Sequence, residues 1–65
     1  MNHVQQQALD RYNEARKNRV TLEIAQCEAV VAGHVVSAEL RQAAGLALLH
    51  EHVARQWMQQ LGVTQ

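Results

Sequence analysis

The longest uninterrupted helical pattern in the chain runs from Ser37 to Leu61. When its residues are projected at about 100° per residue, apolar side chains gather on one face. That face contains Leu40, Ala43, Ala47, Ala54, Trp57, Met58 and Leu61, and it is extended on one side by Leu46, Leu49 and Val53 and on the other by Ala44 and Leu48. The stripe is wider than the narrow seam of a two-stranded coiled coil, so we expect this helix to need neighbours on two sides.

Both ends of this predicted helix carry capping signals. Ser37 is a good N-cap, because its hydroxyl can accept a hydrogen bond from a free N–H of the first turn. Gly62 can adopt the left-handed conformation just after Leu61, which would bring Val63 against Met58 in a Schellman-type ending.

A first helical region is predicted over residues 1–32, beginning with Asn2 and Gln5 at the spacing of a capping box. Its apolar residues form two adjoining stripes, Val4, Ala8, Ala15, Leu22 and Ala29 in one, and Leu9, Tyr12, Val20, Ile24, Cys27 and Val31 in the other. The segment 10–19 is almost wholly polar. One long helix is favoured, and a break near residues 18–21 stays open because boundaries are the weakest part of such a prediction.

The β-branched residues between Val20 and Val36 leave a β-hairpin as an alternative for this segment, with Gly33 and His34 as its turn. Against it, residues 24–32 are rich in Ala, Gln and Glu, which suit a helix, and a lone hairpin would have an open edge. We therefore expect Gly33 to end the first helix in the left-handed conformation.

The expected architecture is one all-α domain of 65 residues, an antiparallel helical hairpin with a helical region over 3–32, a turn at 33–36, a helix over 37–61 and a tail at 62–65. A chain of this size buries only about 60% of its unfolded surface. Its 48% hydrophobic content includes no Phe, one Tyr and one Trp, so the core is made of small side chains. We expect the hairpins to pair into a homodimeric four-helix bundle or to dock on a larger protein.

Composition narrows the cellular setting. A single cysteine rules out an internal disulfide and fits the reducing cytoplasm, where we expect the protein to act. Residues 1–19 are polar, unlike a secretory signal, and no apolar run approaches the roughly 18 residues of a membrane span. The formal net charge of zero argues against general binding of polyanions.

Two residue types invite a chemical interpretation, and both are better explained structurally. On a helix, His50 and His52 point about 200° apart, so they cannot chelate one ion, and we expect no metal, cofactor or catalytic activity. His50 instead falls within the apolar face beside Trp57, where we expect it in a helix interface. Cys27 has no neighbouring cation in the sequence to activate it, and we expect it to be a small buried hydrophobe.

The segment 11–19 is the best candidate for contacts with nucleic acid, through Arg11, Arg16, Lys17 and Arg19. On a helix these cations spread around the cylinder and alternate with Asp10 and Glu14, which is typical of a solvated surface. A dimeric DNA-binding regulator of phage or plasmid type is the alternative function.

The main hypothesis is a small non-enzymatic interaction module of a bacterium or phage: an adaptor, regulator or chaperone-like subunit that binds itself or a larger protein, and no small-molecule substrate. Its expected interaction face comprises Leu40, Ala43, Ala47, His50, Ala54, Trp57 and Leu61. No motif matches a family signature. The expected hairpin looks like the helical-hairpin co-chaperones of type III secretion systems in shape alone, and no residue role is carried over.

Overall fold

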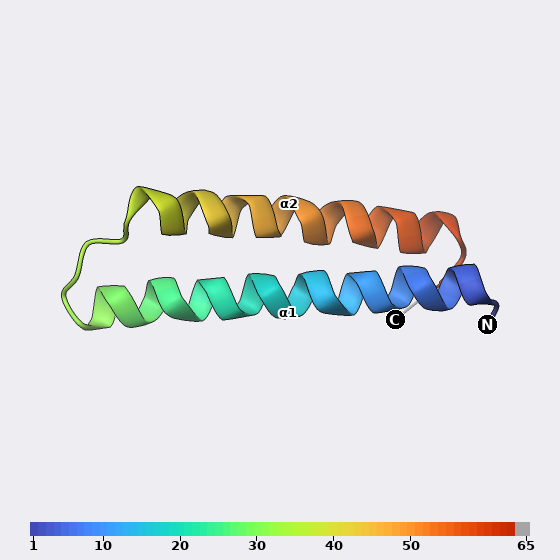
Figure 1. The fold of residues 1–65 in the computed structure, drawn as a ribbon, viewed down its shortest axis with the longest axis horizontal. Helices are drawn as coiled ribbons and strands as arrows, with labels where there is room; N and C mark the ends of the chain where they lie inside the picture. Colours follow the sequence, from blue (N-terminus) through green and yellow to red (C-terminus); the bar gives the residue numbers. More distant parts are fainter. Residues whose placement is uncertain (64–65) are drawn as a thin grey trace.

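The computed structural model consists of two long helices joined by a short turn (Figure 1). It describes residues 1–63, so the last two residues of the expected 62–65 tail lie outside the described part of the chain. Helix α1 spans His3–Val31 and α2 spans Ala38–Gln60, and no strand occurs within residues 1–63. The helices lie antiparallel and side by side in a rod of 47 × 15 × 14 Å. The prediction of an all-α helical hairpin is confirmed.

Helix α1 is continuous over 29 residues, without a break near 18–21. Within that segment the Thr21 hydroxyl donates to the Lys17 carbonyl oxygen at 2.9 Å. Arg19 pairs with Glu23 one turn further on at 2.7 Å. These contacts, together with packing against α2, stabilise the helix in a segment with few apolar residues.

Both helices begin and end as their capping residues predict. Asn2 and Gln5 form a reciprocal capping box, in which each side chain accepts from the other's backbone N–H at 2.8 and 3.0 Å. The Ser37 hydroxyl accepts from the N–H three residues later at 3.1 Å. Gly33 and Gly62 have φ of 78° and 75°, and the hydrogen bonds around each form a Schellman motif.

The contact between the helices follows an alternating spacing of four and three residues. The inward positions are Ala8, Tyr12, Ala15, Arg19, Leu22, Gln26 and Ala29 along α1, and Leu40, Ala44, Ala47, Glu51, Ala54, Met58 and Leu61 along α2 and its C-cap. This is the seven-residue repeat of a two-stranded coiled coil. Only a narrow seam of α2 therefore packs against α1. The rest of its wide apolar face lies outside this contact.

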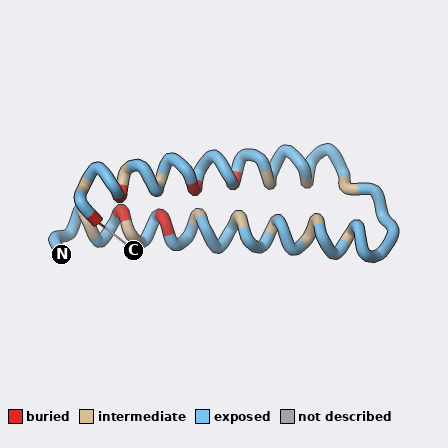
Figure 2. The backbone as a smooth tube through the Cα atoms, turned by 180° about the vertical axis from the view of Figure 1, so that it is seen from behind, coloured by how far each residue is buried: buried red, intermediate tan, exposed pale blue. Residues whose placement is uncertain are grey.

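The buried core lies at the end of the rod where the start of α1 meets the end of α2 (Figure 2). It consists of Ala8, Tyr12, Met58 and Val63. The side-chain Nε2 of Gln5 donates to the Leu61 carbonyl oxygen at 2.9 Å and ties the two helices together there. No residue from 13 to 46 is buried, so the part of the rod that these residues form around the turn is held by half-buried side chains.

The prediction that Cys27 is buried is wrong, because its side chain is exposed. The inward positions at this level are Gln26 and Ala29, which places Cys27 on the outer side of α1. Three other members of the same predicted stripe are also exposed, namely Val20, Ile24 and Val31.

Candidate interaction surface

The structure divides the predicted interaction face of α2 into two parts. Four of its residues, Leu40, Ala47, Ala54 and Leu61, occupy inward positions towards α1 and are buried or half-buried. The other three lie along the side of α2, where Ala43 and His50 are exposed and Trp57 is half-buried. About half of the predicted face is therefore already covered within one chain.

The apolar extension on one side of that face remains largely exposed. Leu46, Leu49 and Val53 are 53%, 55% and 55% exposed. Their spacing of three and four residues aligns them along one side of α2, and we call these three residues the outer ridge. Within residues 1–63, about half of each ridge side chain therefore stays uncovered.

A groove of about 740 Å³ lies between the outer ridge and α1. Its walls are Leu49, His50, Val53, Ala54 and Trp57 from α2, and Arg11, Glu14, Ala15 and Asn18 from α1. The guanidinium carbon of Arg11 lies 5.4 Å from the centroid of the Trp57 ring, a cation–π contact that joins the two walls. The groove therefore combines an apolar wall from α2 with a largely polar wall from α1.

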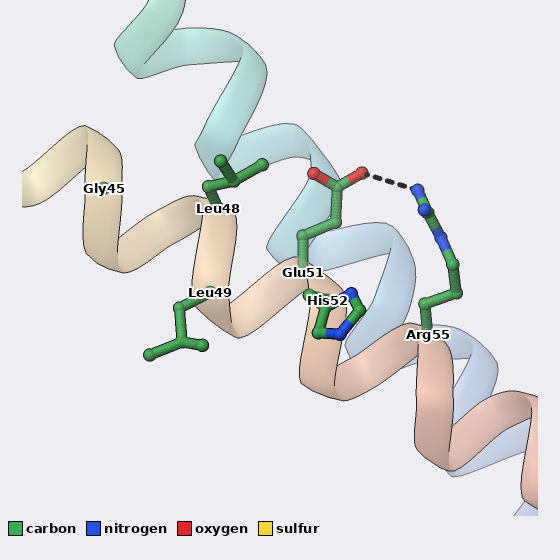
Figure 3. Close-up of a pocket in the computed structure, with 6 residues that line it drawn as sticks. All are labelled: Gly45, Leu48, Leu49, Glu51, His52 and Arg55. Atoms are coloured by element: carbon green, nitrogen blue, oxygen red, sulfur yellow. Dashed lines mark hydrogen bonds and ion pairs between the residues drawn. The ribbon is translucent and has the colours of Figure 1, made fainter.

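The polar residue enclosed between the two helices is Glu51 rather than His50. The Glu51 side chain is only 4% exposed. Its carboxylate accepts a hydrogen bond from Nε of Arg19 across the seam. It accepts a second from Nη2 of Arg55 at 3.5 Å, which Figure 3 shows. The four–three spacing through Ala47 and Ala54 puts position 51 on the inward seam, which is the signal that could have located it.

The two arginines around this carboxylate keep their charge. The hydrogen bond with Glu51, with a smaller contribution from Glu23, raises the pKa of Arg19 above its ordinary value. A hydrogen bond with the Tyr12 hydroxyl, at 3.4 Å, raises the pKa of Arg55. The seam therefore holds the guanidinium of Arg19 and the carboxylate of Glu51 amid mostly small apolar residues.

A second, shallower hollow of about 460 Å³ is formed by α2 alone. It is lined by Gly45, Leu48, Leu49, Glu51, His52 and Arg55 (Figure 3). Leu48 and Leu49 project in different directions from the helix, so Leu48 does not belong to the outer ridge. Leu48 is nevertheless 56% exposed, which makes it a useful comparison for the ridge residues.

The four cations proposed for nucleic-acid contacts do not form one surface. Arg19 turns inward to Glu51, and Arg11 lies over Trp57. Arg16 and Lys17 are exposed. Two of the four are therefore engaged in contacts between the helices.

Within residues 1–63, no group of three or more His, Cys, Asp or Glu side chains is placed to hold a metal ion. Neither helix, over the same residues, has the length and apolar content needed to cross a membrane.

Comparison with known proteins found no matching family model, no matching curated protein and no matching solved structure.

Proposed function

We propose that this chain is a non-enzymatic protein–protein interaction module that forms a homodimer through the outer ridge of α2. The supporting observation is the uncovered apolar surface along that helix, where Leu46, Leu49 and Val53 are each more than half exposed. Contiguous exposed apolar surface of this kind marks interaction sites in soluble proteins.

The total surface area favours association. The chain exposes 4836 Å², whereas a compact monomer of 7.3 kDa is expected to expose about 4,200 Å². The surplus of roughly 650 Å² approaches the ~800 Å² that each partner buries in a standard interface. A second hairpin laid over the ridge would cover most of this surplus and would produce a four-helix bundle.

The outer ridge is suited to contact with its own copy. In an antiparallel pair of α2 helices, Leu46 of one copy lies near Val53 of the other, and Leu49 lies close to the two-fold axis. The ridge contains no charged residue, so no like charges meet across the axis. His50 and Trp57 would lie at the edge of this contact, where the imidazole of His50 can form a hydrogen bond with the second copy.

The native mass of the chain, measured across the micromolar range by sedimentation equilibrium, tests this proposal. We expect two chains per particle for the wild type and one for Leu49→Glu, which places a carboxylate at the axis. Leu48→Glu is the matched control, because Leu48 has the same exposure but lies off the ridge. A monomeric wild type, or equal effects of the two variants, would overturn the dimer.

No observation favours the DNA-binding alternative, since Arg11 and Arg19 are engaged between the helices. Its own test is binding to duplex DNA with a steep salt dependence that Arg16→Ala reduces. Loss of binding only in that variant, with the native mass unchanged, would favour DNA binding over the interaction module.

A further inference from the structure

A second uncovered apolar surface lies on the outer side of α1, near the turn. Val20, Ile24, Cys27 and Val31 recur at spacings of four, three and four residues, and all are exposed; Val31 reaches 88%. With Glu23, Glu28 and Ala32 they line a shallow groove of about 490 Å³. We call these four apolar residues the α1 strip. Every residue of this groove comes from α1 or its C-cap, so the surface is separate from the outer ridge.

Acidic residues border the strip on both sides. At about 100° per residue, Glu23 and Glu28 fall roughly 70° to either side of its centre line. Residues 20–39 contain three glutamates and no Lys or Arg. Glu23 shares Arg19 with Glu51, so these three side chains together keep one net negative charge. The strip is an apolar line with acidic borders along its length, and the exposed Arg16 and Lys17 lie one turn before its start.

The geometry of the strip fits a helix. From Val20 to Val31 the strip extends about 16 Å, or three helical turns. The four–three spacing is the one by which α1 already packs against α2, and it accepts knobs at i, i+3, i+4 and i+7 from a facing helix. A partner helix of three to four turns would cover it.

A second copy of this chain does not offer the complementary surface. Its basic segment 11–19 has Tyr12 and Ala15 as apolar residues, and both occupy inward positions against α2. Its outer ridge has no Lys or Arg within residues 42–54, and the one cation that lines a groove with it, Arg11 of α1, lies over Trp57. The exposed Arg16 and Lys17 adjoin a single aliphatic residue, Val20 at the start of the strip. A second copy therefore offers basic charge beside exposed aliphatic side chains at single positions and not along one side of a helix.

We propose that the α1 strip binds an amphipathic helix of a different protein, one whose apolar side is bordered by Lys or Arg. The buried aliphatic contacts supply affinity, and the charges at the borders set orientation and association rate. The surface does not depend on the proposed dimer. If the dimer forms through the outer ridge, each copy keeps its own strip, and the assembly offers two binding sites to the partner.

A pair of synthetic helical peptides tests this proposal with the full chain. Both peptides carry Leu at four–three spacing; one has Lys and the other Glu along the borders of the Leu side. Binding is followed by fluorescence anisotropy of a dye on the peptide. We expect the Lys peptide to bind about tenfold or more tightly than the Glu peptide, with the difference shrinking at high salt.

Variants of the chain decide whether the peptide binds on the strip. Ile24→Gln should weaken the Lys peptide about tenfold or more, because it removes a central apolar contact. Glu28→Lys should weaken it as well, while Glu14→Lys, an acidic residue of α1 outside the strip, should not. Circular dichroism confirms that each variant remains helical.

Three results would overturn the strip as a binding site: equal binding of the two peptides, undiminished binding to Ile24→Gln, or loss of binding in Leu49→Gln on the outer ridge. A fall in the native mass of Ile24→Gln would show that a second copy occupies the strip, and would overturn the choice of partner. The proposed dimer is tested separately, by comparing the native masses of the wild type and Leu49→Glu.

Discussion

The ion pair of Arg19 and Glu51 lies across the seam between α1 and α2 and favours one alignment of the two helices. The Glu51 carboxylate is enclosed between helices whose other inward residues are mostly Ala, Leu and Met. If the helices slipped by one turn, this carboxylate would face an apolar side chain of α1 and lose Arg19, keeping only Arg55 of its own helix, which is unfavourable. The pair therefore selects one register among several that small residues alone would allow.

Substituting Arg19 and substituting Glu51 should change the free energy of unfolding by different amounts. Arg19→Met leaves an enclosed Glu51 with Arg55 as its remaining cation at 3.5 Å, and Glu51→Met leaves an Arg19 that still pairs with Glu23. We expect Arg19→Met to lower the free energy of unfolding more than Glu51→Met, and the double variant to regain at least the wild-type value. Urea unfolding at one fixed protein concentration measures the cycle, and additive losses in the double variant would contradict it.

Trp57 and Met58 are adjacent but differ in burial. Trp57 is half-buried beneath Arg11, while Met58 belongs to the buried core. Full burial would make Trp57→Ala cost ~3–5 kcal/mol; with the ring half-covered we expect about 1–2 kcal/mol. Met58→Ala should cost more, about 2–4 kcal/mol. If Trp57→Ala is the more damaging in denaturant unfolding, the ring has a larger structural role than its exposure indicates.

Residue type was a poor guide to burial at Cys27, which was expected inside because free cysteines are usually buried. Its side chain is exposed, because it falls outside the inward positions Gln26 and Ala29 of α1. Nothing in the residue type of Glu51 indicates burial, yet its carboxylate is enclosed between the helices, while His50 beside it is exposed in the single chain. The position of each residue in the four–three repeat accounts for this, and the repeat can be found in the sequence when charged residues are counted among its inward positions.

The ends of the helices, in contrast, follow from local sequence. A cap joins a side chain to a backbone group within a few residues, so Asn2, Ser37, Gly33 and Gly62 could be assigned their roles before any packing was known. For the polar segment 10–19 the sequence favours a continuous helix but leaves a break near residues 18–21 open, because it does not show α2 alongside or the cross-helix bond of Arg19.

Two glycines offer opposite effects on helix stability. Gly33 has φ of 78°, so Gly33→Ala should cost about 1–2 kcal/mol by forcing a Cβ into the left-handed region. Gly45 lies within α2, and a Cβ there would meet nothing within 4 Å. Gly45→Ala should therefore add about 0.5–1 kcal/mol. Thermal unfolding of both variants checks the signs, and a loss in Gly45→Ala would show that a partner approaches that position.

The whole rod is unevenly stabilised along its length. Its buried residues lie within residues 8–12 and 47–63, from the end of the rod with the start of α1 to its middle, and none lies between residues 13 and 46 (Figure 2). The order and direction of the two helices follow from two helical patterns and a short turn. These patterns do not show which part of the apolar face of α2 packs against α1 and which part stays exposed. That division depends on the rotation of α2 about its own axis, which the pairing of Arg19 with Glu51 favours.

This unevenness predicts a gradient of hydrogen exchange. Amides of residues 20–31 and 38–46 should exchange faster than those of residues 8–16 and 50–58, because few apolar contacts oppose local opening near the turn. Adding the Lys-bordered peptide should slow exchange in residues 20–31 selectively. Equal protection of both halves without peptide would contradict the gradient.

The contacts that join the helices also restrict how the length of such a chain can change. Gln5 with Leu61, Tyr12 with Arg55, and Arg19 with Glu51 connect α1 to α2 at three successive levels. One inserted or deleted residue in either helix turns everything beyond it by about 100°, so contacts beyond that point no longer match. The length of the turn can vary freely. The helices can change length only if one whole heptad is added to each of them at facing positions. Relatives of this chain should therefore differ in length at the turn, or by such matched pairs of heptads.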